Sequence, residues 1–107
     1  MNDKELADKV IALGVGYQGT YPISCDGVGF YHEPYEDRGM CAELYVRDWR
    51  VAGALMEKCS GVNTVRRDGK WKSYAVKNFG VALTAGNDSM PRAIIEACCE
   101  ALGDGNA

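Results

Sequence analysis

The sequence lacks the long apolar runs and the targeting signals that identify membrane and secreted proteins. No apolar run among its 107 residues approaches the roughly 20 residues that a membrane-spanning helix requires. The N-terminal segment 1–5 is charged and fits the start of an amphipathic helix, which is unlike a secretory signal peptide. We therefore expect a cytoplasmic protein that has no contact with a membrane.

Paired metal ligands and a disulfide framework are also missing. The five cysteines are an odd number, and no two of them have the C-x-x-C spacing of a zinc site. The only candidate ligands within reach of one another in the sequence are Cys25, His32 and Cys41. An odd count without a secretory signal argues against a disulfide framework. We predict no bound metal and no cofactor.

Catalytic constellations are equally scarce, because His32 is the only histidine in the chain. Acyl transfer and hydrolysis need a nucleophile, a base and an orienting group within hydrogen-bond reach. His32 could pair with Cys25 or Cys41, but a lone histidine in a loop is more often simply exposed. The glycines in 14–19 have G-x-G-x-x-G spacing but follow a helical pattern, whereas a dinucleotide site needs them after a strand. We predict no catalytic residues and a protein that is not an enzyme.

What the chain does contain is the pattern of one soluble α+β domain spanning residues 1–107. Its composition is 47% hydrophobic and 25% charged, as in ordinary globular proteins. Apolar residues recur every three or four positions in three segments, which predicts helices near 3–13, 48–60 and 89–102. Asp48 is a helix-start signal for the second helix. Pro91 in the first turn and Gly103 at the end delimit the third.

Between the second and third helices the apolar period changes from 3.6 to 2. This alternation predicts strands at 62–67, 70–77 and 81–85, with Asp68-Gly69 as a tight turn between the first two. We expect a three-stranded antiparallel meander that leads into the last helix.

Residues 17–43 read as a loop-rich insertion with short strands at 21–25 and 28–32 joined by Asp26-Gly27. Aromatic residues gather in it, and they either pack over a sheet edge or form a recognition loop. The candidate binding residues of this insertion are Tyr31, His32 and Tyr35.

Positive charge is concentrated in residues 63–81, which carry five basic side chains and one acidic, although the whole chain has a net charge of −3. Basic groups beside an aromatic are typical of surfaces for single-stranded nucleic acid. Strand alternation, however, places Trp71 on the opposite face from Lys70 and Lys72, so a solvated hairpin is an alternative reading. The candidate residues of this basic hairpin, 65–77, are Arg66, Arg67, Lys70, Trp71, Lys72 and Lys77.

Four segments together resemble a known family. They are LADKVIALG at 6–14, Tyr45-Val46-Arg47-Asp48 with Ala52 and Glu57-Lys58 after it, the strand at Trp71, and Asp88 to Ile94 followed by 97–102. In this order they resemble the phage ABA sandwich domain family of small tailed-phage and prophage proteins. The resemblance covers roughly 4–14 and 44–103, and it leaves out 17–43. It implies a three-layer α–β–α sandwich with a mainly antiparallel sheet, and it brings no catalytic residues because the family's role is not established.

These observations lead us to expect an uncharacterised phage or prophage accessory protein in the cytoplasm of a bacterial host. The leading hypothesis is a non-catalytic protein-interaction module that engages a host or phage protein through 17–43 or the basic hairpin. The alternative is an accessory nucleic-acid-binding protein that uses the basic hairpin, and a small enzyme is third. The side of the sheet on which Trp71 lies, and whether it is exposed, separates the first two.

Overall fold

The computed structural model describes residues 2–20, 28–32, 39–77, 80–83 and 86–103. The described chain forms four helices and five strands. In chain order they are α1 (Asp3–Ala12), β1 (Tyr17–Thr20), β2 (Val28–Tyr31), α2 (Ala42–Tyr45), α3 (Trp49–Met56), β3 (Gly61–Arg67), β4 (Lys70–Lys77), β5 (Gly80–Leu83) and α4 (Met90–Leu102).

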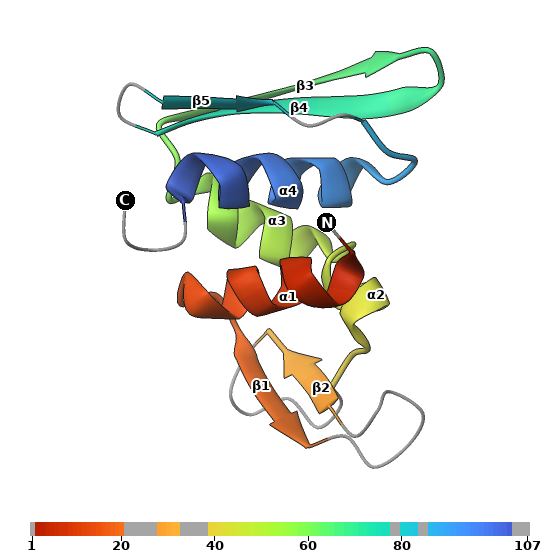
Figure 1. Ribbon diagram of the computed structural model, residues 1–107, viewed down its shortest axis with the longest axis vertical. Helices are drawn as coiled ribbons and strands as arrows, with labels where there is room; N and C mark the ends of the chain where they lie inside the picture. Colours follow the sequence, from red (N-terminus) through yellow and green to blue (C-terminus); the bar gives the residue numbers. More distant parts are fainter. Residues whose placement is uncertain (1, 21–27, 33–38, 78–79, 84–85, 104–107) are drawn as a thin grey trace.

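The helices lie between two separate antiparallel sheets (Figure 1). One sheet contains β3, β4 and β5, and the other is the hairpin of β1 and β2. The α+β class is therefore confirmed. The described residues do not show a single sheet sandwiched between two helical layers, because each sheet has helices on one side only in Figure 1. The α–β–α sandwich stays a prediction.

The three predicted helices are present as α1, α3 and α4, and each begins at a side-chain cap. The side-chain oxygens of Asn2 and Asp48 accept hydrogen bonds from the backbone N–H groups of Glu5 and Arg50, both at 2.8 Å. The hydroxyl oxygen of Ser89 accepts from the N–H of Arg92 at 3.3 Å. Helix α3 ends at Met56 rather than near residue 60, and the sequence pattern does not predict the single-turn helix α2.

Helix α4 is the centre of the fold, because the three-stranded sheet packs on one side of it and α1 and α3 pack on the other (Figure 1). Seven of its residues are buried, including Ile94, Ile95, Ala97 and Cys98. The small side chains of Ala97 and Cys98 let neighbouring elements approach closely. Burial of one isoleucine side chain stabilises the fold by about 1.5–3 kcal/mol, so α4 supplies a large share of the core.

The meander predicted for 62–85 is confirmed as β3-β4-β5. Arg67 pairs with Lys70 across Asp68-Gly69, and both turn residues have positive φ, 53° and 76°, as a tight two-residue hairpin requires. On the face toward α4, Ser73 is fully buried and its hydroxyl lies 2.7 Å from that of Thr64. This hydrogen bond satisfies polar groups that would otherwise be costly to bury.

The β1–β2 hairpin forms the second sheet, in which Tyr17 pairs with Tyr31 and Thr20 with Val28. The predicted strand at 28–32 is present as β2, whereas the strand predicted at 21–25 and the Asp26-Gly27 turn lie outside the described residues. Phe30 turns inward and its ring stacks on Tyr45, with centroids 5.3 Å apart. The Tyr45 hydroxyl donates a buried hydrogen bond of 2.8 Å to the Val15 carbonyl. Because Tyr45 and Phe30 are both buried, they attach the hairpin to the helical core.

An ion-pair network joins the N-terminus of α1 to α4. Arg92 donates to Asp3 at 2.8 Å and to Glu96 at 2.7 Å, and Arg47 donates to the second carboxylate oxygen of Asp3 at 3.1 Å. Burial by itself raises the pKa of Asp3, but the hydrogen bonds from Arg92 and Arg47 outweigh it, so the pKa of Asp3 is lowered. Three segments distant in the sequence are thereby fixed to one another.

Candidate functional site

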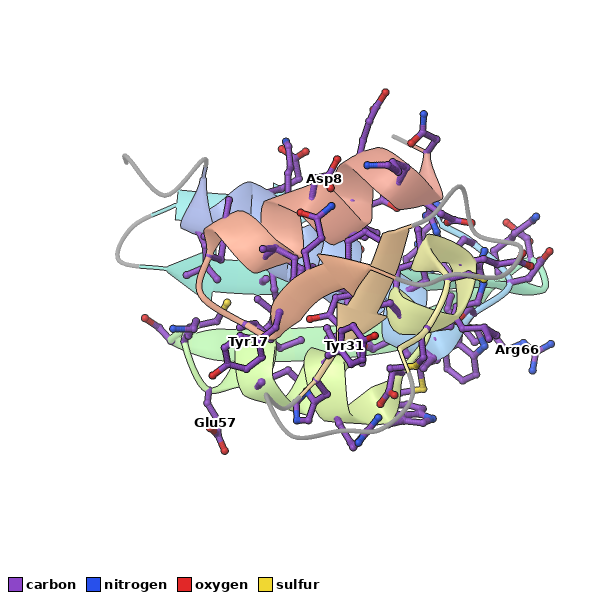
Figure 2. The ribbon with its side chains drawn as sticks, turned by 90° about the horizontal axis from the view of Figure 1, so that it is seen from below. Asp8, Tyr17, Tyr31, Glu57 and Arg66 are labelled. Carbon is purple, nitrogen blue, oxygen red and sulfur yellow. The ribbon has the colours of Figure 1, made fainter. Side chains whose placement is uncertain are left out.

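An open hollow of about 510 Å³ lies where the α1–β1 connection meets the C-terminal half of α3. We call it the α3–β1 hollow. Its lining consists of Gly14, Val15, Gly16, Tyr17, His32, Ala54, Glu57 and Lys58. Figure 2 shows Tyr17 and Tyr31 on the same side of the molecule, with Glu57 projecting from α3 away from its body.

Two glycines shape the chain that forms one wall of the hollow. Gly14 and Gly16 have φ angles of 84° and 79°, in the left-handed region that other residues rarely adopt. A Cβ at Gly16 would collide with the Tyr45 hydroxyl and lie 2.6 Å from the carbonyl oxygen of Tyr31. The backbone can therefore turn from α1 into β1 over the buried Val15 only with glycine at position 16.

Two tyrosines stand side by side on the outer face of the β1–β2 hairpin. Tyr17 pairs directly with Tyr31, and half of the Tyr17 surface is exposed, at 50%. The Tyr31 ring lies against Gly39 and Gly19, since a Cβ at Gly39 would be 2.8 Å from it and one at Gly19 would be 3.1 Å away. Tyr31 is therefore held in place by packing, whereas Tyr17 keeps an accessible aromatic surface.

Charged groups of both signs lie in the neighbourhood of His32. It shares the lining of the hollow with Glu57 and Lys58, and it also influences Asp48 at the start of α3. Burial by itself raises the pKa of Asp48, but hydrogen bonds from Arg50 outweigh it, and the charge of His32 adds to the lowering. The hollow thus offers donors, an acceptor and aromatic surface within one depression.

The described lining of the hollow holds few side chains that could take part in chemistry. Among the described lining residues there is no serine, threonine or cysteine that could serve as a nucleophile beside His32. His32 and Glu57 both line the hollow, so the enzyme alternative keeps a candidate base and a carboxylate in one region. A histidine near a carboxylate becomes a general base only with a substrate atom within hydrogen-bond reach.

The cysteine predictions need one correction. Cys41 is disulfide-bonded, so it is available neither for a catalytic pair with His32 nor as a thiolate ligand. Cys59, Cys98 and Cys99 are free, and Cys25 lies outside the described residues. Within the described part of the chain, no group of three or more histidine, cysteine or acidic side chains could hold a metal ion.

The predicted site residues divide into two separate groups. Tyr31 and His32 lie at the end of β2 beside the hollow, and Tyr35 falls outside the described residues. The basic hairpin lies on the other sheet, across the helical layer from β1 and β2 (Figure 1). Figure 2 shows Arg66 at the edge of the molecule, far from Tyr17 and Tyr31.

Within the basic hairpin, the strand register separates the aromatic from the lysines as predicted. Trp71 pairs with Arg66, whose guanidinium carbon lies 5.4 Å from the centre of the indole ring. Trp71 is half-buried, and Arg66 covers one face of its ring. Lys70 forms an ion pair with Asp88 at 3.2 Å. The described side chains therefore do not present an uncovered tryptophan beside a continuous basic surface.

Three members of the hollow carry no sequence signal for a site. Nothing local distinguishes Tyr17 from the other aromatics of the insertion, and Glu57 and Lys58 fit the solvated side of a helix equally well. A half-exposed aromatic has no signature in a single sequence, and the hollow combines residues from separate elements. Only the structure brings them together.

No known protein family, curated protein or solved structure matches this chain. The resemblance to the phage ABA sandwich domain family therefore stays a prediction. No helix in the described part of the chain is long and apolar enough to cross a bilayer.

Proposed function

We propose that this chain is a small non-catalytic protein-interaction module, and that it binds a segment of a partner protein at the α3–β1 hollow. The observation that supports this most is the half-exposed ring of Tyr17 in the lining of the hollow. Tyrosine is enriched among the residues that dominate binding energy at interfaces, because it offers a large rigid surface and one hydroxyl.

The chemistry of the lining favours a polypeptide segment over a purely apolar ligand. Glu57 and Lys58 provide an acceptor and a donor, and His32 adds a group able to do either. Backbone amides and carbonyls of an extended peptide need partners of both kinds. We therefore expect the partner to insert a mixed polar and apolar segment, with an apolar side chain against Tyr17.

The phage or prophage origin belongs to the same proposal, since it rests on the resemblance in segments 4–14 and 44–103. The finer α–β–α sandwich is also a proposal that rests on this resemblance. No described helix covers the outer face of the sheet β3-β4-β5. The partner is then a host or phage protein, met in the cytoplasm of a bacterium.

The test is affinity capture with the whole chain and one surface variant. Tyr17→Ser removes the exposed ring without opening the core, and we expect it to lower partner binding at least tenfold, which is typical of a lost interface hot spot. Leu44→Ser is the matched control, because Leu44 is also exposed but does not line the hollow. Equal capture by wild type and Tyr17→Ser would contradict the proposal.

Nucleic-acid binding remains the second candidate because of one observation. Arg67 pairs with Lys70 across the hairpin, and Lys72 lies two residues farther along the same strand. These three positive charges therefore share one face of the hairpin. A single-stranded oligonucleotide should then shift in a gel, with affinity that falls steeply as salt rises. Absence of a shift at low salt would eliminate this alternative.

A further inference from the structure

Strand β3 is the outer strand of its sheet, because it pairs with β4 on one side and with no described strand on the other (Figure 1). We call this open side the β3 edge. The open side of such a strand presents backbone N–H and C=O groups, to which another strand can pair. The last two residues of β3, Arg66 and Arg67, are exposed and positively charged. We propose that the β3 edge binds an extended acidic segment of a partner protein, which pairs with β3 as a fourth strand of the sheet.

The register shows which backbone groups face the β3 edge. The N–H of Trp71 donates to the carbonyl of Asn87 at 2.8 Å, and the Trp71 carbonyl accepts from the N–H of Asn87 at 3.0 Å. Trp71 therefore directs both groups away from β3, so its partner in the register, Arg66, directs its own groups away from β4. This direction alternates along a strand, so Thr64 and Val62 also face the edge. Each of these residues offers one donor and one acceptor, along about 14 Å of strand.

Donors and acceptors in this arrangement match the backbone of another extended polypeptide, which carries the same groups at the same spacing. A nucleic acid would contact the arginines through phosphate oxygens, which accept hydrogen bonds but cannot donate to the open carbonyls. The backbone chemistry of the edge therefore favours a polypeptide strand.

The charge of the two arginines is available to a partner. Within the described chain neither arginine forms an ion pair. Arg66 lies over the indole ring of Trp71, a contact that does not neutralise its charge. Consecutive strand residues point to opposite faces, so two successive acidic residues of the added strand would meet one arginine on each face. Strand β3 contains no acidic residue of its own to compete with them.

The same arginines disfavour a second copy of the chain as the occupant. Two antiparallel β3 strands that cross at Thr64 would place Arg66 of one copy opposite Val62 of the other. Arg67 would then lie opposite Gly61, so the arginines of both copies would lack counter-charges. Positive side chains at a sheet edge are a common protection against pairing of like strands. An acidic segment supplies the missing counter-charges, which makes the edge selective for such a partner.

A phage-displayed library of random ten-residue peptides is the probe, with the whole chain immobilised. Peptides that bind the Tyr17→Ser chain as well as wild type are kept, which excludes those that occupy the hollow. We expect the kept peptides to carry two successive acidic residues beside β-branched ones. A synthetic peptide from this set should bind Arg67→Ala at least fivefold more weakly than wild type. Lys4→Ala is the charge-matched control and should bind it equally, because Lys4 is exposed on α1.

Methylation of one peptide backbone nitrogen at a time tests strand pairing itself. Each methyl group removes one N–H, so binding should fall at least tenfold at alternate residues and change little at those between. This scan uses the wild-type chain and does not depend on the folding of a variant. In the protein, Val62→Pro removes one outward N–H and should weaken binding similarly, whereas Val62→Thr keeps the N–H and the shape. Circular dichroism checks that both variants retain the fold.

A library that yields no acidic peptide of this kind would overturn the inference, and so would a methylation scan without alternation. If no peptide is enriched but a single-stranded oligonucleotide binds and Arg67→Ala weakens it, the hairpin serves nucleic acid instead. The kept peptides bind without Tyr17, so these results do not bear on partner capture at the hollow, and the two proposals fail independently.

Discussion

Replacing Arg92 by methionine should destabilise the protein far more than the loss of a fully solvated surface charge would. Arg92 is only 12% exposed and donates to both Asp3 and Glu96, whose side chains are 29% and 22% exposed. Methionine keeps most of the apolar stem but removes both ion pairs. Each hydrogen bond to a charged group contributes about 1.5–3 kcal/mol, and partial hydration of the two carboxylates recovers some of it. We therefore expect a loss of about 2–3 kcal/mol.

That loss corresponds to a fall in Tm of about 10–15 °C for a domain of this length. Thermal unfolding followed by circular dichroism at neutral pH measures it. Lys4→Ala is the control, because Lys4 forms an exposed ion pair of 3.2 Å with Asp8 on the same helix as Asp3. Exposed pairs contribute about 0–1 kcal/mol. If the Tm of the Arg92 variant lay within about 2–3 °C of that of the Lys4 variant, the network could not have the stabilising role assigned to it.

The same network sets a pH dependence with a definite sign. Asp3 has a lowered pKa in the folded protein, so it adds stability above its unfolded pKa of about 3.9. That contribution disappears as the pH falls through the lower, folded pKa, when the folded state also binds the proton. The Arg92 variant should consequently lose less stability than wild type between pH 4 and pH 2.

Three further predictions concern glycine and cysteine. Gly16→Ala should lower the free energy of unfolding by more than about 2 kcal/mol, because residue 16 has a positive φ and a Cβ there would collide with Tyr45. Gly53→Ala should raise it by up to about 1 kcal/mol, because a Cβ at this position in helix α3 meets nothing within 4 Å. Urea titration measures both changes. Burial raises the pKa of Cys98 and raises the pKa of Cys99 to about 12. These thiols therefore ionise first in the unfolded chain, and the free energy of unfolding should fall above pH 9 by up to about 1.4 kcal/mol per pH unit for each thiol. A free energy of unfolding that does not change from pH 9 to pH 11 would contradict this. Cys41 should resist alkylation until a reductant is added, as peptide mass spectrometry can show, and ready labelling without reductant would contradict its disulfide.

Local signals were enough to predict much of this fold. Asp48 begins α3 as expected, and Asp68-Gly69 forms the predicted tight turn, because a cap and a turn depend on two to four consecutive residues. The period-2 pattern after Val62 correctly predicts β3 and β4. In each case the physical cause acts within one element or between adjacent strands.

Long-range pairing was beyond the sequence. Tyr17–Thr20 has no recognisable strand pattern, because glycines flank and interrupt it and its partner β2 follows only after residues 21–27. Arg92 and Asp3 are 89 positions apart, and no local pattern connects them. The same limit applies to the hollow, since Tyr17, His32 and Glu57 come from separate segments that line it together only in the folded chain.

Contact between Tyr17 in the α3–β1 hollow and a partner protein can be tested directly in cells. A photo-crosslinking amino acid is placed at position 17, and separately at position 8 on the exposed side of α1 (Figure 2), in cells that naturally carry the gene. We expect one dominant crosslinked protein from position 17, displaced by excess wild-type chain and absent from position 8. The same products from both positions, or none from position 17, would contradict the proposed interaction.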